Sequence, residues 1–222
     1  MRDLKIWERL FRQALRLVGE IETHGTRHLH WTFGGGTVLM RRHSHRFSKD
    51  IDIFVPDPQA LNYINPRLSD VAEGITGQYE ESNDYVKLYL PEGEIDFVAS
   101  PNLTATPYVE EEIEGRIVKV ETSAEIIAKK FFHRGHRLAA RDVFDFALVA
   151  EREPEQLEAA APFLLRHFDA ICLRLSDDAP IVREQFDAID RLDYSPSFDH
   201  ARRLVLERLQ RFADLERKSG DA

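Results

Sequence analysis

Apolar side chains recur every three or four positions near the start of the chain, with charged residues between them. Over residues 3–24 this spacing predicts an amphipathic helix that ends at Gly25. Its apolar positions are Leu4, Trp7, Leu10, Phe11, Leu15, Val18 and Ile21. The stretch H-L-H-W-T-F at 28–33 alternates in polarity, so it predicts a strand after the helix.

Alternation with a period of two marks the rest of the first half as rich in strands. The predicted strands lie at 50–54, 85–90, 94–99 and 117–120. A turn at 91–93 makes a hairpin of the second and third. Between the first and second, a helix is predicted at about 59–73, after Pro56 and Pro58.

The pattern becomes helical from residue 122 onwards. Thr122 followed by Glu125 forms a capping box, which predicts the start of a helix. Four further helices are predicted at 141–151, 154–171, 180–192 and 196–218. We therefore expect two domains, a mixed α/β domain at 1–121 and a helical domain at 122–222.

Two aspartates lie two residues apart in the predicted strand at 50–54. Because strand side chains alternate between faces, Asp50 and Asp52 point the same way and Ile51 and Ile53 face the core. Two carboxylates on one face repel each other, and burying them is costly unless a cation lies between them. Oxygen ligands of this kind favour Mg²⁺ or Mn²⁺. The motif therefore predicts a divalent-metal site.

A run of three glycines precedes this strand. Gly34, Gly35 and Gly36 form a loop closed by Thr37, and their backbone N–H groups can bind phosphate oxygens. If Thr37 opens a helix, the loop lies at a helix N-terminus, which binds anions. A phosphate-binding loop followed by two carboxylates predicts a site for a metal–nucleoside triphosphate.

Other acidic and basic positions can extend this site. Asp96 lies between apolar neighbours on its strand, as Asp52 does, and is a candidate third metal ligand or base. Lys129 and Lys130 point about 100° apart on a helix, so one of them can reach inward to a triphosphate. Two surface lysines are the simpler interpretation of the same pair.

Asp142 and Asp145 are three residues apart and share a helix face. Asp142 can complement the helix dipole from the first turn. Alternatively, it can pair with a lysine or arginine of the preceding helix and orient that side chain towards the site.

Composition sets limits on function. The 222 residues carry a formal net charge of −9, which argues against a protein that coats nucleic acid without specificity. A local basic patch nevertheless flanks the two aspartates and comprises Arg41, Arg42, His43, His45, Arg46 and Lys49.

The single cysteine, Cys172, suits a reducing compartment, and no apolar run is long enough to cross a bilayer. We therefore expect a cytoplasmic protein.

Four ordered motifs resemble those of the AbiEii family, nucleotidyltransferase-fold proteins of the DNA polymerase β superfamily. They are G-G-G-T-x-L, R-F-S-K-D-I-D-I-F, A-K-K-F-F-H-R-G and A-R-D-V-F-D-F, within residues 30–150. The resemblance implies an α+β fold, in which a nucleotidyltransferase mixed sheet with flanking helices is followed by a C-terminal helical domain. It also implies a nucleotidyltransferase enzyme. Relatives include toxins of abortive-infection and toxin–antitoxin systems, and some transfer nucleotides to the 3′ end of tRNA.

The resemblance also implies roles for single residues. Ser48, Asp50 and Asp52 would hold magnesium and the nucleotide, Lys130 would contact the triphosphate, and Asp142 would complete the site. The family often has G-G or G-S where this chain has three glycines, so the two that bind phosphate are left open.

The sequence thus leads to the hypothesis of Mg²⁺-dependent transfer of a nucleoside monophosphate from an NTP to RNA, by a toxin with a cognate antitoxin. Basic residues would bind the acceptor phosphates, namely Arg41, Arg42 and Arg46, with Arg134 and Arg137 as further candidates. One alternative is transfer to a small molecule or a protein hydroxyl, which the acidic net charge favours. Another is a transferase fold that only binds a partner, and the intact D-x-D and glycine motifs argue against it. A metal nuclease ranks last, because it needs no glycine loop.

Overall fold

A computed structural model describes residues 3–25, 29–176 and 179–220. By their internal contacts these residues divide into two compact units. The first contains residues up to 42, 48–102 and 108–121, and the second contains 43–47, 103–107 and the chain from 122 onwards. The grouping of two short internal segments, 43–47 and 103–107, with the helical part was not predicted from the sequence.

Within the described residues, the first unit is built on a seven-stranded sheet in the order β3-β4-β5-β2-β1-β7-β6. The strands are β1 (Thr32–Gly34), β2 (Ile51–Val55), β3 (Tyr79–Glu81), β4 (Tyr85–Leu90), β5 (Gly93–Ala99), β6 (Tyr108–Ile113) and β7 (Arg116–Glu121). The pairs β1–β7 and β2–β5 are parallel and all the others are antiparallel. The sheet is therefore mixed, as expected.

The alternation of apolar and polar residues predicts several strands of the sheet well. The strands predicted at 50–54, 85–90, 94–99 and 117–120 are confirmed to within one or two residues. Of the stretch at 28–33, only Thr32 and Phe33 lie in a strand, and His28 lies outside the described residues. Strands β3 and β6 were not predicted, because their acidic sequences Y-E-E and Y-V-E-E-E-I show little apolar alternation.

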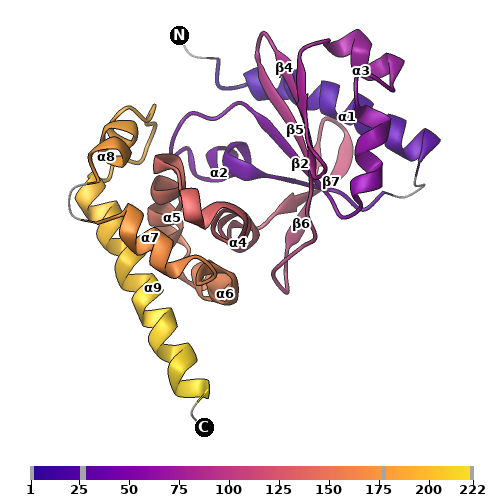
Figure 1. The fold of residues 1–222 in the computed structure, drawn as a ribbon. Helices are drawn as coiled ribbons and strands as arrows, with labels where there is room; N and C mark the ends of the chain where they lie inside the picture. The colour runs from indigo at the N-terminus through magenta and orange to yellow at the C-terminus, as the bar shows by residue number, and fades with distance from the viewer. Residues whose placement is uncertain (1–2, 26–28, 177–178, 221–222) are drawn as a thin grey trace. The chain divides into compact units, whose positions relative to one another are not determined.

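The helices of the first unit are α1 (Ile6–His24), α2 (Gly35–His43), the 3₁₀ helix η1 (Pro58–Ile64) and α3 (Asp70–Ile75). Helix α1 packs against β2, β5, η1 and α3, and Figure 1 shows α1 and α3 along the same side of the sheet. The single helix predicted at 59–73 is wrong. Asn65 precedes a proline and takes an extended conformation, which ends η1, and Ser69 caps a separate helix.

The core of this unit follows the alternation of β2. Ile51 and Ile53 are fully buried, whereas Asp52 between them is half-buried on the opposite face. Phe33 of β1 packs on Phe11 of α1, with ring centroids 4.8 Å apart. The apolar face of the sheet is thus covered by α1, and the aspartate lies on the other face.

The second unit consists of helices in its described residues. They are α4 (Ser123–Arg134), the 3₁₀ turn η2 (Gly135–Arg137), α5 (Ala140–Arg152), α6 (Pro154–Leu164), α7 (Phe168–Arg174), α8 (Pro180–Asp187) and α9 (Phe198–Gly220). Helix α5 packs against α4, α6, α8 and α9 and forms the centre of the unit. The helix predicted at 154–171 is in fact two helices, α6 and α7, with a break after Leu164.

The helix predicted to start after Thr122 is confirmed. The Thr122 hydroxyl accepts the Glu125 backbone N–H at 3.3 Å, as a cap should. The Glu125 carboxylate instead accepts the backbone N–H groups of Leu103 and Thr104 and the Thr104 hydroxyl. Glu125 therefore fixes the segment 103–107 to the helical unit.

Across the described residues, every helix is too short or too polar to meet the requirements of a membrane-spanning segment.

Candidate active site

Four residues on adjacent strands form a row across one face of the sheet. Asp52 of β2 is in register with Gly34 of β1 and with Asp96 of β5. Asp96 is in turn opposite Lys87 of β4. Residues paired across neighbouring strands place their side chains on the same face. Asp52 and Asp96, 44 positions apart in the sequence, are therefore neighbours.

The backbone of Gly35 lies directly against Asp52. A Cβ atom on Gly35 would be 1.8 Å from Oδ2 of Asp52, and the φ of Gly35 is +74°, a conformation that favours glycine. Helix α2 begins at this residue, two positions before Thr37, where the sequence had placed its start. The N-terminus of α2 is therefore next to the Asp52 carboxylate, and no side chain intervenes.

Thr37 links the glycine segment to the aspartates from inside the protein. Its fully buried hydroxyl donates to the backbone carbonyl of Asp50 at 2.6 Å and lies 3.1 Å from the Ser48 hydroxyl. A hydroxyl has one hydrogen to donate, so Thr37 has none left for a phosphate. Thr37 therefore holds α2 against the segment that precedes β2, and its place in the nucleotide site stays a prediction.

Asp50 lies one residue before β2 and is also held by the backbone. Its Oδ1 atom accepts the Glu94 N–H at 3.0 Å. This hydrogen bond ties the start of the D-x-D motif to the start of β5.

The Asp96 carboxylate is half-buried and lies close to a positive and a negative side chain, those of Lys87 and Asp52. Lys87 Nζ is 3.1 Å from Asp96 Oδ2 and 2.8 Å from Glu94 Oε2. The other oxygen, Oδ1, is buried and accepts no hydrogen bond from the described part of the chain. Burial, followed by the negative charge of Asp52, raises the pKa of Asp96 to about 7. Lys87 is shared with Glu94, so it offsets only part of this effect.

Sequence reasoning missed Lys87. Its position in the alternating run Y-V-K-L-Y-L placed it on the polar face of a strand, which is usually a solvated position. Only the strand register shows that this lysine lies opposite Asp96.

Lys130 and Asp142 lie in the second unit and form an ion pair there. Lys130 Nζ is 2.8 Å from Asp142 Oδ1 and 3.1 Å from Asp145 Oδ2. Arg134 also reaches Asp142 Oδ1, at 2.6 Å. The interpretation that Asp142 pairs with cations of the preceding helix is confirmed. Burial alone would raise the pKa of Asp142, but Lys130 and Arg134 outweigh it and hold the pKa well below its usual range.

Comparison with known proteins decides which fold and chemistry these residues belong to. The family described as "Nucleotidyl transferase AbiEii toxin, Type IV TA system" matches residues 17–216. The chain belongs to the AbiEii family. It is therefore a nucleotidyltransferase, for which a nucleoside triphosphate is the expected substrate.

One solved structure agrees with the AbiEii assignment at the level of the fold, and two others are reported with it. A putative nucleotidyltransferase from H. pylori has a TM-score of 0.50 at 17% identity, covering 96% of this chain and 95% of that one. JHP933 from Helicobacter pylori has a TM-score of 0.48 at 17% identity, covering 95% and 94%. The antibiotic-resistance factor ANT(2'')-Ia has a TM-score of 0.40 at 15% identity, covering 96% and 98%. No curated protein sequence matches the chain.

A divalent cation, as nucleotidyltransferases usually use, fits the residues of this AbiEii protein. Asp52 and Asp96 repel each other across neighbouring strands, and a cation beside Asp52 would relieve this repulsion. No group of three or more His, Cys, Asp or Glu side chains among the described residues is arranged to hold a metal. Mg²⁺ needs no such group, because it commonly binds one or two carboxylates and completes its shell with water and substrate phosphates.

The arginines expected to bind an acceptor are already engaged with the protein. Arg41 forms an ion pair with Glu111 at 3.0 Å and lies over the Trp7 ring. Arg42 donates to the backbone carbonyl of Glu121 at 2.9 Å. Both side chains are about one-fifth exposed, at 22% and 23%, so an edge of each remains accessible.

Arg46 differs from these two, because it is buried in the second unit. Its Nε and Nη2 atoms donate to the two oxygens of Asp145 at 2.7 and 2.8 Å. This pairing with Asp145 was not predicted, and it leaves the expectation that Arg46 binds an acceptor phosphate as a prediction. Sequence reasoning failed here because the partner lies 99 residues further along the chain.

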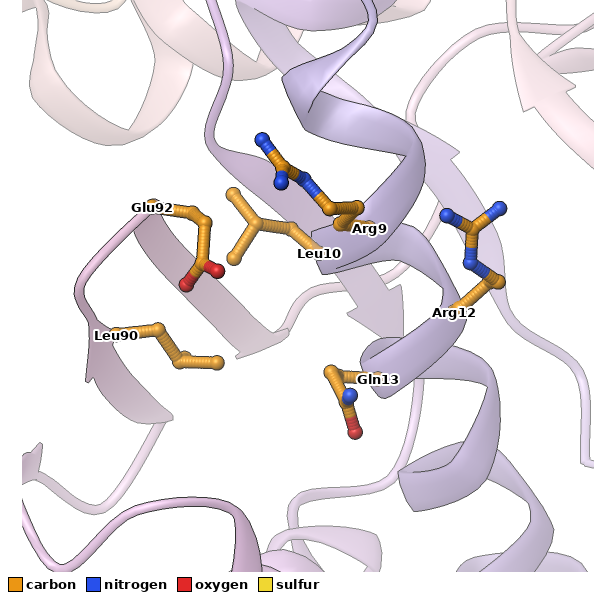
Figure 2. Close-up of a pocket in the computed structure, with 6 residues that line it drawn as sticks. All are labelled: Arg9, Leu10, Arg12, Gln13, Leu90 and Glu92. Carbon is orange, nitrogen blue, oxygen red and sulfur yellow. The ribbon is translucent and has the colours of Figure 1, made fainter.

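A hollow beside α1 is not part of this site. It has a volume of about 200 Å³ and is lined by Arg9, Leu10, Arg12, Gln13, Leu90 and Glu92 (Figure 2). Arg9 forms an ion pair with Asp3, and Arg12 forms one with Glu114, so both charges are compensated. None of the predicted site residues that the structure describes lines this hollow.

Proposed function

We propose that this AbiEii protein transfers a nucleoside monophosphate from an NTP to a hydroxyl of an RNA acceptor, such as the 3′ end of tRNA. The observation that carries the proposal is the register of Asp52 with Asp96, beside the side-chain-free backbone of Gly35. Asp52, with Asp50, would hold Mg²⁺, Asp96 beside it would take up the proton of the acceptor, and the adjacent helix N-terminus would bind phosphate.

Each of these residues would have a distinct role in the transfer. Asp50 and Asp52 hold the metal, and the N–H groups of Gly35 and Gly36 hold the β- and γ-phosphates. When bound, Mg²⁺ neutralises the negative charge that develops on the phosphates. Lys130 balances charge on the departing pyrophosphate.

The proton of the acceptor passes to Asp96. As the acceptor oxygen forms its bond to the α-phosphorus, the bond from that phosphorus to the β-phosphate oxygen breaks, and pyrophosphate leaves. The hydroxyl proton moves to Oδ1 of Asp96, which has no hydrogen-bond donor within the described chain.

An RNA acceptor and an antitoxin complete the proposal. The family description names a toxin of a type IV toxin–antitoxin system, so we propose a cognate antitoxin as the partner. The accessible edges of Arg41 and Arg42, on the helix that starts at the proposed phosphate site, support contact with acceptor phosphates.

The activity is tested with purified protein, α-labelled NTPs, MgCl₂ and either total RNA or purified tRNA. Wild type is expected to label RNA, and Asp52→Asn should reduce the rate by about 10³-fold or more, because it removes a carboxylate that would hold the metal. Asp84→Asn, at an exposed position in the turn before β4, is the matched control and should retain full activity.

The same assay also identifies which class of molecule accepts the nucleotide. Labelling that weakens steeply with salt supports RNA. Labelling of aminoglycosides or of a protein, with RNA unlabelled, would replace the RNA acceptor by a small molecule or a protein hydroxyl. Equal labelling by wild type and Asp52→Asn would overturn the assignment of the site.

A further inference from the structure

Residues 43–47, called here the anchor segment, connect two parts of the proposed site but belong to the helical unit. The segment follows α2, whose first residue is Gly35, and it is followed by Ser48 and the D-x-D motif. Any movement of the anchor segment is therefore transmitted through covalent bonds to the phosphate-binding helix on one side and to Asp50 on the other.

Backbone hydrogen bonds hold the anchor segment within the second unit. Phe47 N–H donates to the Asp190 carbonyl at 2.7 Å. The carbonyls of Ser44 and His45 accept from Asp193 and Leu192 at 2.7 and 3.0 Å. The segment is thus paired along its length with the stretch that follows α8.

Two side chains of the anchor segment, those of His45 and Arg46, converge on one carboxylate, that of Asp145. Oδ1 accepts from Arg46 Nε at 2.7 Å and lies 2.8 Å from Nε2 of His45, and Oδ2 accepts from Arg46 Nη2 at 2.8 Å. Lys130 Nζ lies 3.1 Å from the same Oδ2 atom. Asp145 is therefore the common partner of the anchor segment and of the lysine proposed to contact the triphosphate.

All of these groups are buried, which makes their geometry specific. The side chains of His45 and Asp145 are fully buried, and those of Arg46 and Lys130 are exposed by only 7% and 8%. A buried ion pair adds little net stability compared with apolar side chains of the same size. The two-point contact between Arg46 and Asp145 does fix the direction of both side chains, because a guanidinium and a carboxylate match in only one planar arrangement.

We propose that Asp145 is a positioning residue for nucleotidyl transfer, which acts by fixing the anchor segment through Arg46 and orienting Lys130. The inference rests on the proposed roles of Asp50, Asp52 and Lys130. It assigns a function to Arg46 that differs from acceptor binding, and it predicts that loss of the contact changes the rate of transfer more than the affinity for nucleotide.

The test compares Asp145→Asn and Arg46→Lys with wild type in the transfer assay at 20 °C. Asparagine keeps the shape but loses the charge, and lysine keeps the charge but loses the two-point contact. Each variant is expected to lower kcat by about tenfold to 10²-fold, the scale of a small misplacement of reacting groups, and to change the KM for NTP far less. Hydrogen–deuterium exchange of residues 44–52 should become faster in both.

Leu209→Ala is the matched control. Leu209 is fully buried in α9 and has an apolar side chain, so the substitution destabilises the same unit and removes no charged or hydrogen-bonding group. At 20 °C, where it is folded, it should keep wild-type kcat and wild-type exchange at 44–52.

Two results would overturn the inference. One is a wild-type kcat in a folded Asp145→Asn or Arg46→Lys protein. The other is an equal loss of kcat in Leu209→Ala, because the effect would then be one of general stability. If Asp145→Asn does not fold, Arg46→Lys still tests the inference, because it breaks the same contact from the other side. Failure of the proposed function would give a different result. Wild-type protein would then transfer no nucleotide, or Asp52→Asn would be as active as wild type.

Discussion

Single residues of this protein have roles that depend on which neighbour the fold supplies. Asp52 acquires Asp96 as a neighbour through strand register, and Gly35 presents its backbone to the same carboxylate. Arg46 has the same residue type as Arg41 and Arg42, yet it is buried against Asp145. Residue type therefore indicates which chemistry is available, and the contact decides which chemistry is used.

The most specific prediction for a single residue concerns Gly35. In Gly35→Ala the new Cβ would overlap Asp52 Oδ2, and the positive φ of +74° would be strained, so Asp52 must move. We expect kcat for nucleotidyl transfer to fall by about 10²-fold or more. The steady-state kinetics of transfer measure this directly.

Gly19→Ala is the control for this substitution. Gly19 lies within α1, and a Cβ there would meet no atom within 4 Å among the described residues. This variant should be fully active and more stable by about 0.5–1 kcal/mol, because alanine favours a helix. Normal activity in Gly35→Ala would show that the contact with Asp52 is irrelevant to catalysis.

Elements of the structure are joined by a few side chains at their ends. Thr122 caps α4 and also donates its hydroxyl to the Thr106 carbonyl at 3.0 Å. Glu125, one turn later, binds the backbone of Leu103 and Thr104. The start of α4 is therefore also the point to which segment 103–107 is attached.

Loss of the cap at Thr122 should destabilise the protein without changing its chemistry. Thr122→Ala removes the acceptor for the Glu125 N–H, so we expect the free energy of unfolding to fall by about 1 kcal/mol. Urea denaturation measures this change, and Thr122→Ser, which keeps the hydroxyl, should remain close to wild type. A Thr122→Ala protein as stable as wild type would mean that water replaces the cap.

At the scale of the whole molecule, buried charges make stability depend on pH. Burial lowers the pKa of His45 below its ordinary value of about 6.5, so this residue is buried in its neutral form. Burial would raise the pKa of Asp145, but Arg46 and Lys130 outweigh it and hold the pKa well below its ordinary value, as Lys130 and Arg134 do for Asp142. Both kinds of shift make the unfolded chain bind more protons than the folded one.

The raised pKa of Asp96 acts in the opposite direction, because the folded chain binds a proton there from about pH 7 downwards and the unfolded chain only near pH 4. In an Asp96→Asn background, which removes this opposing titration, stability is therefore expected to fall on acidification in two stages. The unfolded chain gains a proton at His45 as the pH falls below about 6.5, and the folded chain does so only at lower pH. Below about pH 4 the unfolded chain also protonates Asp142 and Asp145, which stay ionised in the folded protein. Thermal unfolding measured from pH 7.5 to 3.5 tests this prediction.

His45→Gln separates the two stages. A glutamine can still donate to Asp145 but does not titrate, so the loss of stability between pH 7 and 5 should shrink while the loss below pH 4 remains. An unfolding temperature that is constant from pH 7 to 4 would contradict the prediction.

Much of the fold and part of the candidate site could be predicted from the sequence. Periodicity located α1, β2, β4, β5 and the start of α4, because an apolar face repeats wherever an element covers a core. It missed the acidic edge strand β6, whose pairing needs no apolar face, and it merged η1 with α3 across a proline.

The sequence by itself determined the local properties of this protein: the period of its elements, the D-x-D spacing, the run of glycines and the AbiEii motifs. The tertiary structure alone decided that Asp96 and Lys87 share a row with Asp52, that Thr37 is buried, and that Arg46 is bound to Asp145. The physical reason is distance along the chain. Local patterns arise from bonds and contacts within a few residues, whereas strand register and buried ion pairs join groups tens of residues apart, whose meeting depends on how the whole chain packs.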